Sequence, residues 1–350
     1  MKPDSFTSCT GVDAILLNNL SNLRYFTNFT GSSGFAVISK KQSYFLTDNR
    51  YRCQAKKEID PAFKIIIYDQ KSLQPVLTIL KKVKPGTLGI EAESLPFSIV
   101  KKIKSQMKGL KLGDVSEKVL MLRSVKTNEE LKKIKKALHI AEQSFKKIQG
   151  IIKPGLSEKD IALELDYEMR KNGCEKIAFS TIVASGVNSA LPHAHATNQK
   201  IKNNSILLLD FGCTIDGYSS DITRVIFIGK SKPVFKKMFY TVKEAYHQSI
   251  NFLSSNREAS ILTHQVDRFI RKSGFKDGLI HSLGHGVGLD IHELPVLSKF
   301  KKSTLRSGHV FTIEPGIYIP HLGGIRLENM IHLTEKGPEV LNKLPMEFSI

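Results

Sequence analysis

The feature that most constrains the fold is a pattern that occurs twice in the C-terminal half: an apolar run that ends in a carboxylate and a turn. Residues 206–212 read Ile-Leu-Leu-Leu-Asp-Phe-Gly, and residues 310–316 read Val-Phe-Thr-Ile-Glu-Pro-Gly. A predicted helix and a Gly- and His-rich segment precede each run, and a second strand with its own carboxylate follows it. The pattern predicts an internally duplicated αββ unit in an α+β domain, although two such units can also resemble each other by chance.

The first unit contains an Asp-Gly pair at 216–217, which is a favoured two-residue hairpin turn. With this turn, Asp210 lies opposite Thr223, and Asp221 lies opposite Gly212. Because side chains alternate along a strand, Asp210 and Asp221 become diagonal neighbours about 7–8 Å apart at the backbone and can share one ion. The alternative, two solvent-facing carboxylates, fits poorly because the run before Asp210 is apolar at every position.

The second unit repeats this arrangement with Glu314 and Glu328. Buried carboxylates need a partner, and a cation can serve all four. For Glu328 a plain ion pair with Arg326, which shares its strand face, is the competing interpretation.

His285 is the candidate nitrogen ligand, in a glycine-rich segment with His281 four residues before it. The spacing lacks the glutamate of a zincin helix, so a zincin site is not expected. One histidine and four carboxylates suit Mn²⁺, Co²⁺, Fe²⁺ or Zn²⁺. They can hold two ions about 3.5–4 Å apart, which would activate a shared water and polarise a carbonyl group. This chemistry is hydrolysis.

The formal net charge of +19 raises nucleic acid or an acidic membrane as partners. The lysines are, however, scattered, and groups such as those in 101–104 and 132–136 alternate with apolar residues as on solvated helix faces. We therefore expect no nucleic-acid partner. The strongest apolar run, 206–209, is far shorter than the roughly 20 residues of a membrane span, and the N-terminal stretch, with Asp13, does not resemble a signal peptide.

The cysteines, Cys9, Cys53, Cys174 and Cys213, lie far apart and show no C-x-x-C spacing. This spacing disfavours a zinc ribbon and a disulfide scaffold. It favours the reducing environment of the cytoplasm.

The length of 350 residues predicts two domains. We expect a small α/β domain at 1–122, with strands near 35–38, 43–46, 65–67 and 87–90, a helix ending near 85–86, strand-like runs and turns over 22–59, and a break near 113–122. The second domain, 123–350, should open with two helices. Their starts are predicted by capping-box spacing at Thr127 with Glu130 and at Ser157 with Asp160.

The candidate ligands are Asp210, Asp221, His285, Glu314 and Glu328, with ten residues between the two aspartates. This set resembles that of the pita-bread metallopeptidases, which include methionine aminopeptidase, aminopeptidase P and prolidase. The resemblance covers 123–350. Residues 22–27 and 47–51 resemble the creatinase-type N-terminal domain of the proline-specific branch, which methionine aminopeptidase lacks. The resemblance implies a pita-bread catalytic domain preceded by an α/β creatinase-type domain.

Carried over by position, the resemblance implies that Asp210 chelates one ion, that His285 and Glu314 hold the other, and that Asp221 and Glu328 bridge both. Glu314 would also shuttle protons to and from a bridging hydroxide. It further implies a substrate-side role for His193, a role for His292 in stabilising the tetrahedral intermediate, a pocket role for His281, and support of the bridging glutamate by Arg326. His195 has no counterpart, and Asn329 stands where many relatives have Asp.

The expected activity is therefore that of an Xaa-Pro aminopeptidase, which removes an N-terminal residue that precedes proline. We expect two divalent metal ions per chain, with Mn²⁺ favoured over Co²⁺, Zn²⁺ or Fe²⁺. We also expect a homodimer. Prolidase, which cleaves Xaa-Pro dipeptides, is the alternative. From another class, an inactive binding protein of the same fold is disfavoured because all five ligands are present.

Overall fold

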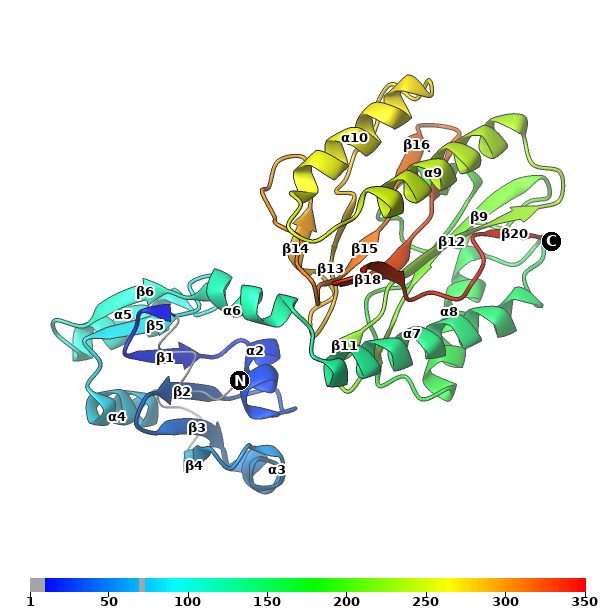
Figure 1. Ribbon diagram of the computed structural model, residues 1–350. Helices are drawn as coiled ribbons and strands as arrows, with labels where there is room; N and C mark the ends of the chain where they lie inside the picture. The colour runs from blue at the N-terminus through cyan, green and yellow to red at the C-terminus, as the bar shows by residue number, and fades with distance from the viewer. Residues whose placement is uncertain (1–9, 69–72) are drawn as a thin grey trace. The chain divides into compact units, whose positions relative to one another are not determined.

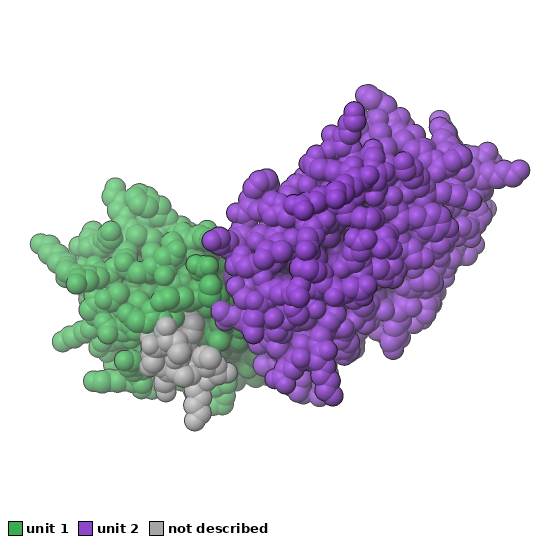
Figure 2. Space-filling model, turned by 45° about the horizontal axis from the view of Figure 1, so that its top comes forward, with its two compact units in different colours: residues 1–123 green, residues 124–350 purple. Residues whose placement is uncertain are grey.

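The computed structural model describes residues 10–68 and 73–350. The chain forms two compact units, residues 1–123 and 124–350 (Figure 2). Each unit has its own buried apolar clusters, so each is described separately.

The first unit is built on a six-stranded sheet with the strand order β4-β3-β2-β1-β5-β6 (Figure 1). The strands are β1 (Ala14–Leu17), β2 (Phe35–Ser39), β3 (Ser43–Asp48), β4 (Phe63–Tyr68), β5 (Thr87–Ile90) and β6 (Lys111–Asp114). Its described helices are α2 (Leu20–Thr27), α3 (Arg52–Glu58), α4 (Gln74–Val83), α5 (Phe97–Gln106) and α6 (Ser116–Ser124), with a short 3-10 turn at Asn49–Tyr51. Apolar residues from both faces of the sheet enter two separate clusters, as expected of an α/β layer structure.

The four strands predicted in this unit are confirmed as β2, β3, β4 and β5, and the predicted helix before 85–86 is α4. The prediction of only strands and turns over 22–59 is wrong, because α2 and α3 lie there. In α2, Leu23 is fully buried and the Asn19 side chain caps the first turn, so local capping and packing override the β-forming aromatics. The predicted break at 113–122 is also wrong, since α6 occupies most of it.

The second unit begins with two helices whose starts follow the predicted capping boxes. In α7 (Asn128–Gln149) the Thr127 side chain accepts from the Glu130 backbone while Glu130 bonds back, and Ser157 and Asp160 do the same for α8 (Glu158–Lys171). Two further helices follow, α9 (Pro233–Phe252) and α10 (Ala259–Lys272). Among the described residues, no helix is both long and apolar enough to cross a bilayer.

The strands of this unit lie between the two helix pairs, α7 with α8 and α9 with α10 (Figure 1). One sheet has the order β20-β12-β9-β8, and another the order β14-β13-β15-β18-β19. Their strands are β8 (Ile182–Ser185), β9 (Ser205–Phe211), β12 (Ile222–Ile228), β13 (Gly284–Gly286), β14 (Glu293–Leu297), β15 (Val310–Ile313), β18 (Asn329–Thr334), β19 (Gly337–Val340) and β20 (Glu347–Ser349). Short strands complete the unit: β7 (Lys176–Ile177), β10 (Cys213–Ile215), β11 (Tyr218–Ser219), β16 (Gly316–Ile319) and β17 (Gly323–Arg326).

The predicted hairpin register is confirmed. Asp216 and Gly217 both have positive φ, 48° and 80°, as a type I′ turn requires, and Asp210 pairs with Thr223. In the second half, the β15–β18 and β16–β17 pairs belong to one continuous hairpin. Ile313 pairs with Asn329, and three residues nearer the turn on each strand Gly316 pairs with Arg326, so the register does not shift between them. The two halves therefore present equivalent hairpins, each with two carboxylates.

Candidate metal centre

Four of the five predicted ligands lie at strand ends of the second unit, and the fifth lies within a strand. Asp210 is next to last in β9, and Asp221 directly precedes β12. Glu314 directly follows β15, Glu328 directly precedes β18, and His285 is the central residue of β13. The duplicated hairpins thus deliver four carboxylates, and the glycine-rich segment delivers the imidazole.

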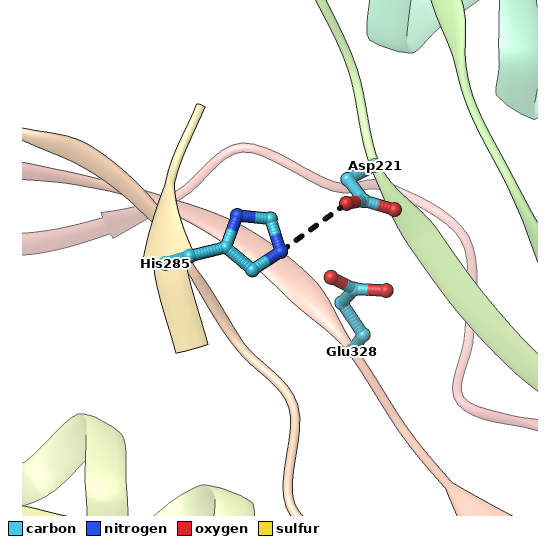
Figure 3. Close-up of side chains that lie close together, drawn as sticks. All are labelled: Asp221, His285 and Glu328. Carbon is cyan, nitrogen blue, oxygen red and sulfur yellow. Dashed lines mark ion pairs between the residues drawn. The ribbon is translucent and has the colours of Figure 1, made fainter. Parts of the chain in front are cut away.

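The structure brings four of these side chains close together, and Asp210 is linked to them through Arg326 and Thr223. His285 Nε2 lies 3.5 Å from Asp221 Oδ2 and 3.4 Å from Glu314 Oε1. Potential ligand atoms of Asp221, His285 and Glu328 all lie within 4.8 Å of one another, and their side chains converge from separate strands (Figure 3). Glycines permit this approach: a Cβ at position 284 would lie 1.9 Å from the Thr312 carbonyl oxygen.

Two threonine hydroxyls orient the glutamates. Thr223 Oγ1 donates to Glu328 Oε2 at 2.7 Å, and Thr312 Oγ1 donates to Glu314 Oε1 at 3.1 Å. The Thr312 hydroxyl also accepts from the His285 backbone N–H at 3.1 Å. Hydrogen bonds of this kind fix the direction in which a ligand's oxygen points.

Arg326 forms its ion pair with Asp210, at 2.5 Å, rather than with Glu328. It reaches Glu328 through Thr223, whose hydroxyl accepts from Arg326 Nε at 3.1 Å. The plain Arg326–Glu328 ion pair considered above is therefore not formed. Asn329 accepts from the buried guanidinium of Arg224 at 2.7 Å and stays outside the ligand cluster.

The carboxylates experience strong mutual repulsion. Burial raises the pKa of Asp221 well above its ordinary value, and the charges of Glu328, Asp210 and Glu314 add to the increase. Burial likewise raises the pKa of Glu328 and of Glu314. Burial lowers the pKa of His285, which favours the neutral imidazole that binds metals. The cluster therefore requires protons or cations to be stable.

The residues present fit a divalent cation. Asp210 Oδ1 is a buried oxygen for which no hydrogen-bond partner exists among the described residues. A buried carboxylate oxygen without a donor calls for a cation, and the surrounding donors are oxygen atoms and one imidazole, as hard or borderline divalent ions prefer.

The three further histidines predicted at the site differ in their contacts. The His292 ring stacks edge-on against His285 with centroids 4.2 Å apart. His281 Nε2 lies 3.0 Å from the Tyr318 hydroxyl. His193 is exposed, and its charge contributes to lowering the pKa of both His281 and His292, after burial as the main cause. His195 is an exposed loop residue.

Tyr318 and the two threonines are functional residues that were not predicted from the sequence. Tyr318 accepts from Arg326 Nη1 at 2.7 Å, and burial raises the pKa of its phenol to about 12, so it stays protonated. Thr223 could have been found, because the hairpin register places it opposite Asp210. Tyr318 could not, since its neighbours depend on how the second hairpin meets the rest of the unit.

Comparison with known proteins identifies the family of each part of the chain. Residues 132–335 match the family model for metallopeptidase family M24, and residues 7–125 match the creatinase/prolidase N-terminal domain. The Xaa-Pro dipeptidase of Pyrococcus furiosus is 33% identical over 98% of this chain and 97% of its own.

Solved structures are similar over almost their whole length. The X-Pro aminopeptidase from Thermotoga maritima MSB8 superposes with a TM-score of 0.90 at 36% identity, covering 99% of this chain and 100% of that one. The Xaa-Pro dipeptidase from Bacillus anthracis gives a TM-score of 0.94 at 36% identity, covering 100% and 98%. The predicted fold, a pita-bread domain preceded by a creatinase-type domain, is confirmed. The chain belongs to metallopeptidase family M24.

Proposed function

We propose that this protein is an Xaa-Pro aminopeptidase that uses two divalent metal ions. The observation that carries the proposal is the cluster of Asp221, His285 and Glu328, whose potential ligand atoms lie within 4.8 Å of one another, with Glu314 3.4 Å from His285. Only protons or cations relieve the charge repulsion among these carboxylates. The proposed ligands are Asp210 for one ion, His285 and Glu314 for the other, and Asp221 and Glu328 for both. Bound ions would supply a water of lowered pKa and polarise the scissile carbonyl group.

The remaining chemistry falls to the protein's own side chains. Glu314 Oε1 accepts from Thr312, so Oε2 is the oxygen that we assign to receiving the proton of the attacking water and passing it to the leaving proline nitrogen. His292, exposed beside His285, would donate a hydrogen bond to the oxyanion of the tetrahedral intermediate. His193 and His281 would bind the substrate, and Arg326 would hold Asp210 in place.

The choice between aminopeptidase and dipeptidase rests on the N-terminal segments 29–34 and 47–51, which resemble those of aminopeptidase P. Prolidase is the second candidate because the relatives from P. furiosus and B. anthracis bear the name Xaa-Pro dipeptidase. Hydrolysis of Xaa-Pro dipeptides should be compared with that of tripeptides and longer peptides with proline second. We expect higher kcat/KM on the longer peptides; cleavage of dipeptides alone would establish prolidase instead.

The replacement Asp221→Asn tests the metal assignment. It removes a shared ligand and one like charge, so we expect activity on Xaa-Pro peptides to fall while the thermal midpoint of the metal-depleted protein is kept. Loss of a hydrogen-bond partner of a ligand alone costs about 10–100-fold, and we expect loss of the ligand to cost more than about 100-fold. The matched control is Asp216→Asn in the same hairpin, where Asn tolerates the positive φ. Full turnover by Asp221→Asn would refute the assignment.

The nature and number of the ions are proposed as two Mn²⁺ per chain. Dialysis against EDTA, readdition of Mn²⁺, Co²⁺, Zn²⁺ or Fe²⁺, and elemental analysis would determine both. We further propose a homodimer, to be tested by light scattering. A cytoplasmic location is supported by the free thiols of Cys53, Cys174 and Cys213; Cys9 lies outside the described residues.

A further inference from the structure

Lys126 and Glu293 form a fully buried ion pair that is not part of the ligand cluster. Lys126 Nζ lies 2.6 Å from Glu293 Oε1, and each side chain is only 1% exposed. Moving two charges out of water costs free energy that their attraction often fails to recover. A pair in this position therefore needs an explanation beyond stability.

Lys126 is itself firmly held. Its backbone N–H donates to the Gly308 carbonyl at 2.8 Å, and its Nζ also donates to the Ser124 carbonyl at 3.2 Å. The preceding residue, Val125, forms a bridge with His309. The ammonium group is therefore held in one position and can in turn hold a second element in place.

Glu293 fills the inside of the loop formed by residues 287–292. Its Oε2 accepts from the Asp290 backbone N–H at 3.4 Å, while Gly288 N–H donates to the Asp290 carbonyl at 3.0 Å. A Cβ at Gly288 would lie 2.4 Å from Glu293 Oε1, so the glycine leaves the space that the carboxylate occupies. The loop is thus wrapped around the carboxylate that Lys126 holds.

The far end of this loop reaches the ligand cluster. His292, the last residue of the loop, packs its ring edge-on against the His285 ring, with the ring centroids 4.2 Å apart. Within residues 10–68 and 73–350, no hydrogen bond to the exposed His292 ring is found. The position of this imidazole therefore depends on the backbone that carries it.

We propose that the Lys126–Glu293 ion pair positions His292 for catalysis by holding the loop 287–292 from inside. The proposal rests on the role of His292 in the proposed function. Lys126 and Glu293 are positioning residues, because both act on His292 through the loop.

A double-mutant cycle between Lys126 and His292 tests this coupling. We expect Lys126→Met to lower kcat on an Xaa-Pro tripeptide at least tenfold, with KM and bound metal per chain unchanged. In the His292→Ala background, Lys126→Met should change kcat by less than twofold, because its effect passes through the missing imidazole. Additive losses, or a loss of bound metal, would overturn the proposal.

Hydrogen–deuterium exchange of the metal-depleted protein provides a readout that does not depend on activity. We expect the amides of residues 287–292 to exchange at least tenfold faster in Lys126→Met, with α7 and α8 unchanged. Unchanged exchange in the loop would refute the positioning role. If the wild-type protein cleaves no Xaa-Pro peptide, the proposed function fails, and the exchange result still decides whether the pair holds the loop.

Two further variants separate positioning from stability. Lys126→Arg keeps the charge and should restore most of kcat, whereas a purely structural role would restore the thermal midpoint alone. If Lys126→Met does not fold, the double variant Lys126→Met/Glu293→Gln removes both charges and should fold with low kcat; wild-type kcat in it would refute the proposal. The control is Lys132→Met, which breaks the exposed Lys132–Glu129 pair and should leave kcat unchanged.

Discussion

At the scale of single residues, Thr223 connects the two halves of the catalytic unit through one hydroxyl group. It donates to Glu328, accepts from Arg326, and pairs through its backbone with Asp210. Buried polar networks of this kind are rigid when every member is satisfied. The orientation of the glutamate is therefore set by a residue of the opposite hairpin.

His309 gives the catalytic unit a pH-dependent stability. Burial, with the charges of Lys126 and Arg306, lowers the pKa of His309 to about 4, and its Nδ1 accepts from the Arg306 backbone N–H at 3.1 Å. The unfolded chain, with a pKa near 6.5, binds a proton that the native state excludes. The contribution of His309 to stability is therefore unaffected above about pH 6.5 and becomes less favourable by roughly 2–3 kcal/mol as the pH drops towards 4.

The replacement His309→Asn tests this expectation, because Asn supplies an acceptor but does not titrate. Urea midpoints measured between pH 7 and pH 4.5 should decline less steeply in His309→Asn than in the wild type. The exposed His195 serves as the control, and His195→Asn should keep the wild-type slope. Equal slopes in the wild type and His309→Asn would contradict the assignment.

The sequence was informative about residues whose neighbours are local. The proximity of Asp210 and Asp221 follows from one hairpin with a turn encoded by two residues. The ion pair of Arg326 with Asp210 joins positions 116 residues apart and depends on how the second hairpin meets β9. No short-range pattern encodes such a contact.

At the scale of elements, helix starts were predictable where side chains cap them. Thr127 and Ser157 mark α7 and α8 through reciprocal bonds that lie within four residues. The helix α6 was missed because its apolar residues do not gather on one face. The helix α2 was missed although Asn19 caps it, because Asn22 rather than Glu or Gln stands three residues later and eight residues show little periodicity. The seven-residue helix α3 was missed because it has no side-chain cap.

The close contact of β13 with Thr312 predicts the effect of a single methyl group. In Gly284→Ala the new Cβ would lie 1.9 Å from the Thr312 carbonyl oxygen, which belongs to backbone that cannot move aside easily. We expect a loss of roughly 1–3 kcal/mol in the free energy of unfolding and weaker metal binding, because the bond from His285 to Thr312 is disturbed. Urea denaturation and metal titration measure both.

The matched control for this variant is Gly150→Ala at the end of α7. Gly150 has a helical φ of −69°, and the nearest atom to a new Cβ is the Lys147 carbonyl oxygen at 3.9 Å. We expect its unfolding free energy to change by less than about 0.5 kcal/mol. Gly284→Ala with wild-type stability and metal affinity would show that β13 can shift without cost.

At the scale of the whole molecule, the two units have separate apolar cores and all proposed ligands belong to the second. We therefore expect two calorimetric transitions, of which only one responds to metal. At a free Mn²⁺ concentration of 100 Kd the stabilisation is about 2.7 kcal/mol, which raises the midpoint of a unit of this size by roughly 5–10 °C. Scans in EDTA and in Mn²⁺ measure the shift; two transitions moving in parallel would show that the units unfold together.

The buried Lys126 limits where the chain can be cut and rejoined between the two units. Junctions between domains ordinarily tolerate inserted residues and exchange of the neighbouring domain. Here Ser124 and Lys126 are buried, and the Lys126 backbone is tied to Gly308. A chimaera that joins a foreign N-terminal domain to this peptidase must therefore keep residues 124–127 of this chain. By the proposal above, a junction placed within these residues would disturb Lys126 and so displace His292.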